Sequence, residues 1–171
     1  FGDFDGQGVL FPGQGLGLNP DEVTIARLLR GAGYATALVG KWHCGDQPEF
    51  LPTRHGFDRY FGLPYSNDMG RQEDADMYPP LPLLRGEEVI QQQPDQMALT
   101  ERYTEECVRF MRERRDRPFF LAMAHMHVHL PLYAADRFVR ESRNGRYGAC
   151  VEAIDWSTAA LEDRARLLCE E

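Results

Sequence analysis

The apolar and polar positions of the chain first predict a helix that follows a glycine-rich opening segment. Asn19 is a favourable capping residue, and Pro20 suits the first helical turn because no amide hydrogen is needed there. Gly31 and Gly33 are expected to end this helix after about residue 30. We therefore predict a helix over residues 20–30.

Beyond this helix the pattern is that of a strand, a long loop and a second helix. The apolar run 35–40 has the length of a buried strand. Residues 44–96 contain many Pro, Gly, Asp and Asn residues and show little periodicity, apart from a short strand expected at 88–91. Loops of this length are uncommon unless they line a functional site. Over residues 96–115, apolar side chains recur at helical spacing, and arginines stand at the end where the helix dipole favours cations.

Two further elements complete the alternation. Residues 118–129 are expected to form a fully buried strand, and residues 147–168 a long helix. Helices and strands in this order predict an α/β fold with a mainly parallel sheet. The 171 residues, of which 43% are apolar, are enough for one domain with its own core. We predict a single unit over residues 1–171.

Charge and hydropathy argue against two classes of partner. The chain has 19 basic and 27 acidic residues and a net charge of −8, so a nucleic acid would be repelled. No apolar run reaches the roughly 18 to 20 residues that cross a bilayer, so we expect no membrane segment. The 4 cysteines are far apart in the sequence and do not indicate a compartment.

The first residues that indicate chemistry follow the strand predicted at 35–40. In open α/β sheets, ligands bind beyond the carboxyl ends of the strands, and Lys41 and His43 stand at such an end. If the backbone stays extended, their side chains point to the same side, which brings a cation and an imidazole to one point. This pair suits an anionic substrate. A surface lysine beside a histidine that binds backbone is the alternative from these residues alone.

A second group of polar residues ends the strand predicted at 118–129. His125, His127 and His129 share one face if the strand continues that far, which could bind Zn²⁺ or place a general acid. A polar network of histidines at a strand end is an equally open interpretation. Ser66 lies in a turn-rich loop with hydroxyl, amide and carboxylate groups, and no nucleophile motif of serine hydrolases surrounds it.

Several of these segments together resemble the sulfatase family, most closely its arylsulfatase branch. Residues 33–43, which end in Gly-Lys-Trp-His, are similar to the family's second signature. Residues 55–66, 117–132 and 147–155 support the resemblance in the family's order, and it covers about residues 8–168. The resemblance implies the alkaline-phosphatase-like α/β sandwich. We expect the chain to be an incomplete, internal piece of the catalytic domain.

The resemblance also implies an activity, the hydrolysis of small-molecule or carbohydrate sulfate esters. Lys41 resembles the lysine that binds sulfate and formylglycine. His43 resembles the histidine that contacts the formylglycine hydroxyl and accepts its proton. His129 resembles the histidine that protonates the leaving alcohol, and Ser66 a serine that helps to position sulfate. Family members are often secreted, periplasmic or lysosomal.

Family members also need a nucleophile and a metal that this sequence does not supply. The nucleophile is formylglycine, made from cysteine in a Cys-x-Pro-x-Arg motif, and a Ca²⁺ ion, sometimes Mg²⁺, holds the sulfate. The resemblance implies that this motif and the first pair of metal-binding aspartates lie before Phe1, and that a later Asp-Asn pair lies beyond Glu171. We expect no metal ligand within the chain. Cys44 stands where the family usually has leucine and is not expected to be the nucleophile.

Two alternative functions stay open at this point. One is a zinc-dependent hydrolase built on His125, His127 and His129, which would need stoichiometric Zn²⁺. The other is a non-catalytic, sulfatase-like binding protein whose complete gene lacks the nucleophile. The flanking coding sequence would distinguish the second from an enzyme, because an enzyme needs Cys-x-Pro-x-Arg upstream and an Asp-Asn pair downstream.

Overall fold

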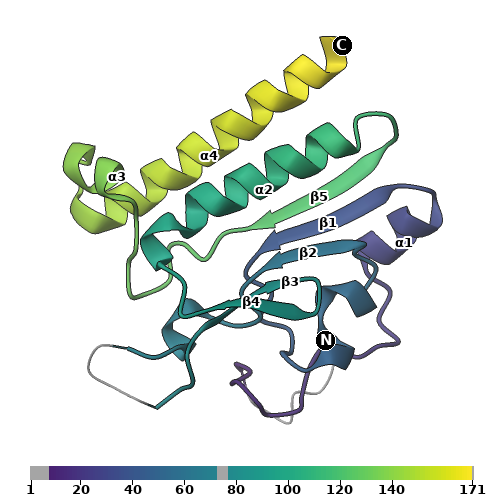
Figure 1. Ribbon diagram of the computed structural model, residues 1–171, viewed down its shortest axis with the longest axis horizontal. Coiled ribbons are helices and arrows are strands. Elements are labelled where there is room, and N and C mark those ends of the chain that lie inside the picture. Colours follow the sequence, from purple (N-terminus) through teal and green to yellow (C-terminus); the bar gives the residue numbers. More distant parts are fainter. Residues whose placement is uncertain (1–7, 73–76, 171) are drawn as a thin grey trace.

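The computed structural model describes residues 8–72 and 77–170, and its centre is a five-stranded sheet in the order β4-β3-β2-β1-β5 (Figure 1). Three of the strands run parallel: β2 (Arg59–Gly62), β1 (Ala35–Gly40) and β5 (Phe119–Ala124). The other two, β3 (Pro82–Arg85) and β4 (Glu88–Gln92), continue the sheet in antiparallel pairing. The predicted α/β fold is confirmed, as is the short strand expected at 88–91.

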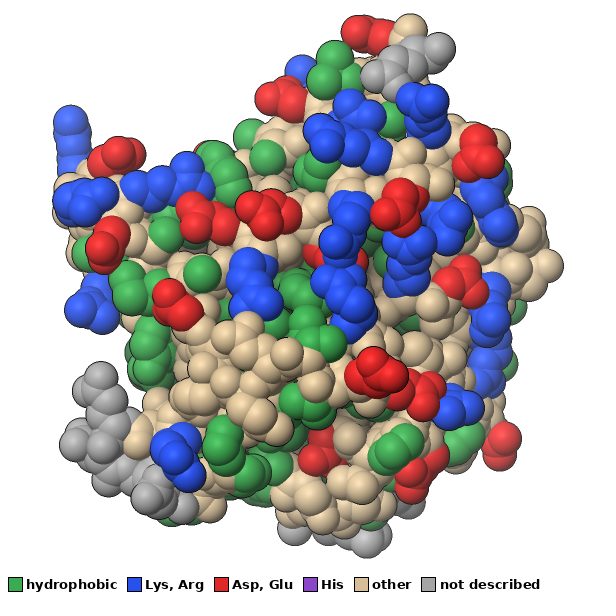
Figure 2. Space-filling model, viewed as in Figure 1, with side chains coloured by type: hydrophobic (Ala, Val, Ile, Leu, Met, Phe, Trp, Pro, Cys, Tyr) green, Lys and Arg blue, Asp and Glu red, His purple; other side chains and the backbone are tan. Residues whose placement is uncertain are grey.

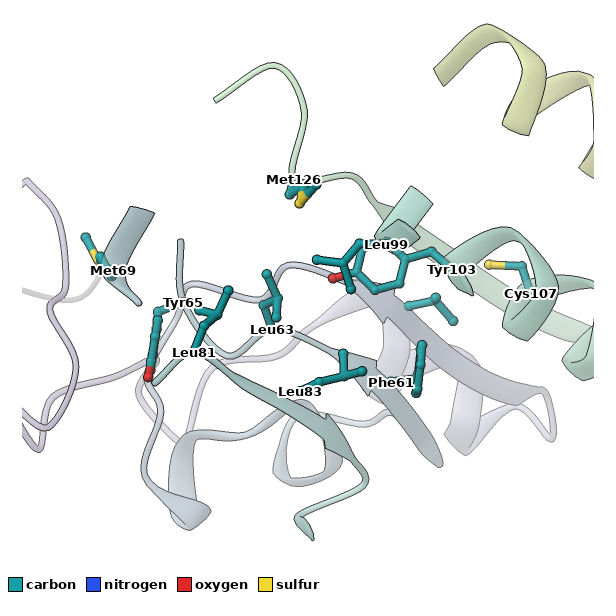
Figure 3. Packing of buried hydrophobic residues seen from close by; sticks show 11 residues of the cluster. Phe61, Leu63, Tyr65, Met69, Leu81, Leu83, Leu99, Tyr103, Cys107 and Met126 are labelled. Carbon is teal, nitrogen blue, oxygen red and sulfur yellow. The ribbon is translucent and has the colours of Figure 1, made fainter. Parts of the chain in front are cut away.

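The core surrounds β1, all of whose residues are buried. Because side chains alternate along a strand, β1 contributes to both faces of the sheet. Val39 joins the apolar cluster beneath α2 (Leu99–Glu113), which is drawn in Figure 3. Leu38 joins the cluster on the opposite face, where Ala26 of α1 (Ile25–Gly31) packs. The strand predicted over residues 35–40 is confirmed.

Two long helices cover one face of this sheet. The buried residues of α2 include Tyr103, whose ring packs edge-on against Phe61 of β2 with 6.1 Å between the centroids. α4 (Gly145–Glu170) packs on α2, and α3 (Asp136–Glu141) packs against the start of α4 through Phe138. The helices predicted at 96–115 and 147–168 are confirmed, although a 3-10 turn precedes α2 and α3 was not predicted. No described helix has both the length and the apolar character needed to span a membrane.

The helix predicted at residues 20–30 begins later than its capping signal indicated. Asn19 does form a local cap, because its Oδ1 accepts from the amide of Asp21 at 2.9 Å, but this interaction closes only a turn. Thr24 is the residue that caps α1, since its Oγ1 accepts from the amide of Arg27 at 3.0 Å. The predicted start was therefore wrong by several residues.

The strand predicted at residues 118–129 was wrong in its length and its burial. β5 ends at Ala124, and beyond it the amide of His129 donates to the carbonyl of Met126 at 3.2 Å, which is a turn. All residues of β5 are only partly buried, because β5 is an edge strand of the sheet within the described residues. Within the segment 44–96, which was expected to be mainly loop, the strands β2 and β3 were missed.

Candidate active site

The carboxyl ends of β1, β2 and β5 meet at one edge of the sheet, where Gly40 and Gly62 permit close packing. A Cβ atom on Gly40 would lie 1.8 Å from the carbonyl oxygen of Ala124, and one on Gly62 would lie 1.8 Å from that of Gly40. Only glycine fits such an approach. The chain then leaves β1, and the amide of Lys41 donates to the Ala124 carbonyl at 2.7 Å. Lys41 is thereby placed at the edge where ligands of α/β sheets bind.

The backbone after β1 is not extended, contrary to the expectation for Lys41 and His43. Gly40 has φ 118° and His43 has φ 58°, so the chain turns twice within this short segment. The turn is fixed by the next loop, because the amide of His43 donates to the carbonyl of Pro64 at 3.0 Å. Lys41 and His43 are nevertheless close, since the charge of Lys41 contributes to lowering the pKa of His43. The pair forms, but by a tight turn and not by strand alternation.

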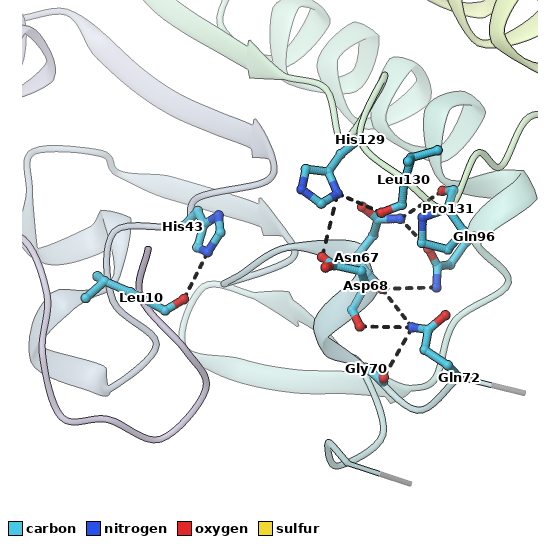
Figure 4. Close-up of polar contacts among 10 residues, drawn as sticks. All are labelled: Leu10, His43, Asn67, Asp68, Gly70, Gln72, Gln96, His129, Leu130 and Pro131. Carbon is cyan, nitrogen blue, oxygen red and sulfur yellow. Dashed lines mark hydrogen bonds and ion pairs between the residues drawn. The ribbon is translucent and has the colours of Figure 1, made fainter. Parts of the chain in front are cut away.

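The hydrogen bond of His43 defines which of its ring nitrogens is free. Nε2 lies 3.1 Å from the carbonyl oxygen of Leu10, and because a carbonyl only accepts, Nε2 carries the hydrogen (Figure 4). Burial is the largest influence on this ring and lowers its pKa, while the Leu10 hydrogen bond opposes that change. A neutral ring with hydrogen on Nε2 leaves Nδ1 as a proton acceptor.

His129 has the opposite arrangement. Its Nδ1 lies 2.7 Å from the carbonyl oxygen of Leu130 and 3.7 Å from Oδ1 of Asp68 (Figure 4). Because Nδ1 donates to a carbonyl, Nε2 is the nitrogen left for a substrate. The side chain is about half exposed, at 46%. His129 can therefore present Nε2 to a ligand at the sheet edge.

Asp68 joins these residues in one electrostatic cluster. Burial lowers the pKa of Lys41, and the nearby carboxylate of Asp68 opposes this by raising it. The same carboxylate raises the pKa of His43, whereas His129 lowers it. An ammonium, two imidazoles and one carboxylate thus interact electrostatically with one another. This arrangement suits an anion that reacts with loss or gain of a proton.

A polar network fixes the loop that carries Asp68. The Nδ2 of Asn67 donates to Oε1 of Gln96 at 3.1 Å and to the carbonyl of Pro131 at 3.3 Å (Figure 4). Gln96 lies in the turn that precedes α2, and Pro131 follows His129 by two residues. Asn67 therefore connects the loop after β2, the start of α2 and the segment after β5. Three predicted residues, Lys41, His43 and His129, are held together by this network and the turn after β1.

Ser66 stands at the start of the same loop but is not open to solvent. The residue is fully buried, and its Oγ has no hydrogen-bond partner among residues 8–72 and 77–170. Asp68, which was not predicted as a site residue, is the loop's contribution to the charge cluster. Its position after a parallel strand was the usable signal, but β2 is only four residues long and was read as part of a loop.

His125 and His127 do not share a face with His129. Nε2 of His127 lies 2.7 Å from Oγ1 of Thr100 in α2, and Nε2 of His125 lies 3.3 Å from Oγ of Ser157 in α4. Burial lowers the pKa of His127 to about 4. The zinc site required a strand through His129, and that premise is wrong. Within the described ranges, no group of three or more His, Cys, Asp or Glu side chains could hold a metal ion, so these residues do not fit Zn²⁺ or Ca²⁺.

The cysteine nearest to the cluster in sequence has no feature of a nucleophile. The thiol of Cys44 donates to the carbonyl of Trp42 at 3.5 Å, and burial raises its pKa. Reactive cysteines instead need a lowered pKa, because the thiolate is the nucleophile. The cluster can bind an anion and move protons, but the described cysteines give it no group for covalent attack.

The family model described as Sulfatase matches residues 10–166. The chain belongs to the sulfatase family. Arylsulfatase A of Homo sapiens is 36% identical to it over 172 residues, which cover 90% of this chain and 34% of that protein. N-acetylgalactosamine-6-sulfatase of Sus scrofa is 36% identical over 156 residues, which cover 85% of this chain and 30% of that protein. The sulfatase chain therefore spans about a third of the length of these relatives.

Solved structures of sulfatases have the same fold. Ps i-CgsB, crystallised in complex with k-i-k-neocarrahexaose, superposes with a TM-score of 0.75 and 27% identity, covering 94% of this chain and 40% of that one. The PsFucS1 sulfatase from Pseudoalteromonas sp. superposes with a TM-score of 0.74 and 27% identity, covering 93% of this chain and 38% of that one. The alkaline-phosphatase-like sandwich implied by the resemblance is confirmed.

Proposed function

We propose that this chain is part of the catalytic domain of a sulfuric ester hydrolase of arylsulfatase type, with residues 1–171 forming one partial domain. The observation that carries the proposal is that His43 and His129 lie at the carboxyl edge of the sheet near Asp68 (Figure 4), where Lys41 interacts electrostatically with His43 and with Asp68. The relatives named arylsulfatase A and N-acetylgalactosamine-6-sulfatase support sulfate esters as the substrate class. The complex of Ps i-CgsB with k-i-k-neocarrahexaose supports a carbohydrate as the part of the substrate that carries the sulfate.

Lys41 would bind the sulfate group. Its ammonium has no hydrogen bond or ion pair within the described part of the chain, so it is free for an anionic ligand. In a partly buried position the attraction between unlike charges is stronger than in water. A fixed cation would stabilise the charge that develops on the sulfate oxygens in the transition state. Ser66, whose buried hydroxyl has unused hydrogen-bonding capacity, would help to position the same group.

The two histidines would carry out opposite proton transfers. Nε2 of His129 would donate a proton to the leaving alcohol, because Nδ1 is already used on Leu130. Nδ1 of His43 would accept a proton, because Nε2 is used on Leu10 and burial keeps the ring neutral by lowering its pKa. General acid–base catalysis needs one group in each protonation state. The two hydrogen bonds to backbone decide which nitrogen of each ring faces the substrate, and His129 would donate its proton from the doubly protonated ring.

A nucleophile and a metal would have to come from outside these residues. The proposed nucleophile is formylglycine, and no described cysteine is suited to the role. A bound Ca²⁺ would neutralise charge on the sulfate. Because the described residues do not form a site for it, we derive no step through the ion.

Extension of the chain into its flanking coding sequence tests the proposal. Residues 1–171 and a form extended through the upstream Cys-x-Pro-x-Arg and the downstream Asp-Asn pair are to be compared for sulfate release from nitrophenyl sulfate and sulfated saccharides. We expect release only from the extended form, and loss of release when the upstream cysteine is replaced by alanine. Equal release from the short chain would overturn the proposal, and an inactive extended form that binds sulfated saccharides would favour the non-catalytic alternative.

A further inference from the structure

We propose that Asp68 is a positioning residue for the reaction, the counter-ion that holds His129 and Lys41 in one pocket. The inference rests on the proposed function, because the reaction is that of the proposed sulfatase. It concerns a residue that neither the sequence motifs nor the anionic substrate class would select. A carboxylate beside an anion site repels the ligand, so its presence there requires a separate reason.

The first argument is the position of one carboxylate oxygen. Oδ1 of Asp68 is shielded from solvent and has no hydrogen-bond partner within residues 8–72 and 77–170, while its nearest ionic partner is Nδ1 of His129 at 3.7 Å. A buried carboxylate oxygen without a hydrogen bond is unfavourable unless nearby positive charge compensates for it. Lys41 supplies part of that charge, and His129 adds to it when it is protonated. The carboxylate therefore interacts with both groups that the proposed reaction uses.

The second argument is that Asp68 is held from both sides. It lies in the 3-10 turn Asn67–Met69, and Nε2 of Gln72 donates to its carbonyl oxygen at 3.1 Å. Its neighbour Asn67 donates to the carbonyl of Pro131, which follows His129 in the chain. The segments that carry Asp68 and His129 are thus joined directly. Because the backbone that carries the carboxylate is fixed in this way, the carboxylate can set the orientation of the His129 ring.

The third argument concerns repulsion within the site. Besides burial, the charges of Lys41 and His129 lower the pKa of His43. The only described carboxylate that raises this pKa is Asp68. Without Asp68, the three groups that carry or accept positive charge, Lys41, His43 and His129, would repel one another. Such repulsion would widen the site and misplace the proton donor, which lowers the rate more than it weakens binding.

The experiment replaces Asp68 by Asn in the extended, active protein. We expect kcat for alkyl or sugar sulfates to fall about 10- to 100-fold, which is less than the roughly 10² to 10⁴ that a positioned general acid contributes, because the acid is misplaced and not removed. KM should stay unchanged or fall, because a charge that repels the substrate has been removed. Asp68→Glu should restore part of kcat. Asp21→Asn, which removes an exposed carboxylate elsewhere, is the matched control and should change neither constant.

A double substitution shows whether Asp68 acts through His129. Asp68→Asn combined with His129→Ala should be no slower than His129→Ala alone, because residues that act as one unit are not additive. Multiplying effects, or a rise in KM with unchanged kcat, would overturn the proposal. Thermal unfolding of each variant checks that the fold is kept.

A measurement that does not depend on activity separates this inference from the proposed function. Because the carboxylate of Asp68 raises the pKa of His43, Asp68→Asn should move the NMR titration of His43 to lower pH. An inactive wild-type protein would reject the proposed function, while an unchanged His43 titration would reject the placement of Asp68. Failure of the proposed function and failure of the role of Asp68 therefore give different experimental results.

Discussion

The two edges of the central sheet use charge in different ways. At the carboxyl edge of β1, Lys41 is partly buried and makes no ion pair within the described residues. Toward the other edge, Glu106 of α2 accepts from both guanidinium nitrogens of Arg85, at 2.7 and 3.0 Å, and also from Arg109. Lys, Arg, Asp and Glu side chains lie next to one another on the face shown in Figure 2. The Lys41 ammonium makes no direct hydrogen bond and is available to a ligand, whereas the directly hydrogen-bonded charges around Glu106 stabilise the fold.

One helix connects these two regions. The turn before α2 and its first residues contact the site, through Gln96 to Asn67 and through Thr100 to His127. The middle and end of α2 carry Glu106 and Glu113, which pair with arginines of the sheet. The ion pairs therefore fix the position of a helix whose start supports the active-site loops. Substitutions in the active-site region should lower activity, and substitutions among the ion pairs should lower stability.

The largest expected effect is the loss of turnover in Lys41→Ala. Loss of one preorganised charge contact in the transition state costs about 3 to 4 kcal/mol, or roughly 10² to 10³ in kcat. The melting temperature should change little, because the ammonium makes no hydrogen bond within the described residues and Asp68 keeps His129 as an ionic partner. Steady-state kinetics and thermal unfolding of the extended protein measure both. Arg112→Ala, on an exposed part of α2, is the control and should leave kcat unchanged.

The Lys41→Ala variant also tests whether the charges at the two edges of the sheet really differ in role. If its replacement lowered the melting temperature together with kcat, the ammonium would be a structural group. The carboxyl edge would then resemble the paired edge, and the assignment of a sulfate contact would fail.

A smaller effect, on stability only, is expected for Glu106→Gln. The carboxylate is nearly buried and binds two arginines, so neutralising it weakens several charge-assisted hydrogen bonds. Arg85 and Arg109 are about half exposed and stay hydrated, which limits the loss to about 1 to 3 kcal/mol. Chemical denaturation measures it, with Glu88→Gln on the exposed strand β4 as the control. A lower kcat/KM in the fully folded variant would contradict the separation of the two edges.

Sequence reasoning predicted the elements with a strong period and missed those without one. β1 was predicted because its residues form an apolar run of strand length, and the structure buries all six of them. α2 was predicted because its apolar residues recur on one face. β2 and β3 have four residues each, too few to show alternation. Pairing with neighbours along the sheet decides such short strands, and the sequence does not show that pairing.

The active site was predicted only in part, because its geometry also depends on contacts that the sequence does not show. Lys41, His43 and His129 lie at one edge of the sheet, and their roles stay a prediction, but the extended backbone expected for Lys41 and His43 was wrong. Gly40 and the left-handed His43 turn the chain after β1, and a turn at Met126 replaces the strand that was to carry three histidines. Asp68 was missed because its loop follows a strand that was itself missed. Contacts between distant segments could not be read from spacing.

The smallest expected effect tests a histidine at the active-site edge that does have a partner. His127 is bound to Thr100, and burial lowers its folded pKa to about 4, against about 6.5 in an unfolded chain. Between these values the unfolded chain binds a proton that the folded chain does not, so stability falls as the pH decreases from about 6.5 to about 4. His127→Gln keeps a polar partner for Thr100 and removes this titration. It should flatten the pH dependence of the unfolding free energy by on the order of 1 kcal/mol once solvent screening is counted, whereas the exposed neighbour Val128→Ala should retain the wild-type slope. If His127→Gln left the pH dependence of the unfolding free energy unchanged, His127 would not be held neutral by burial. Its hydrogen bond to Thr100 would then not contribute to stability in the way expected for the ion pairs of Glu106.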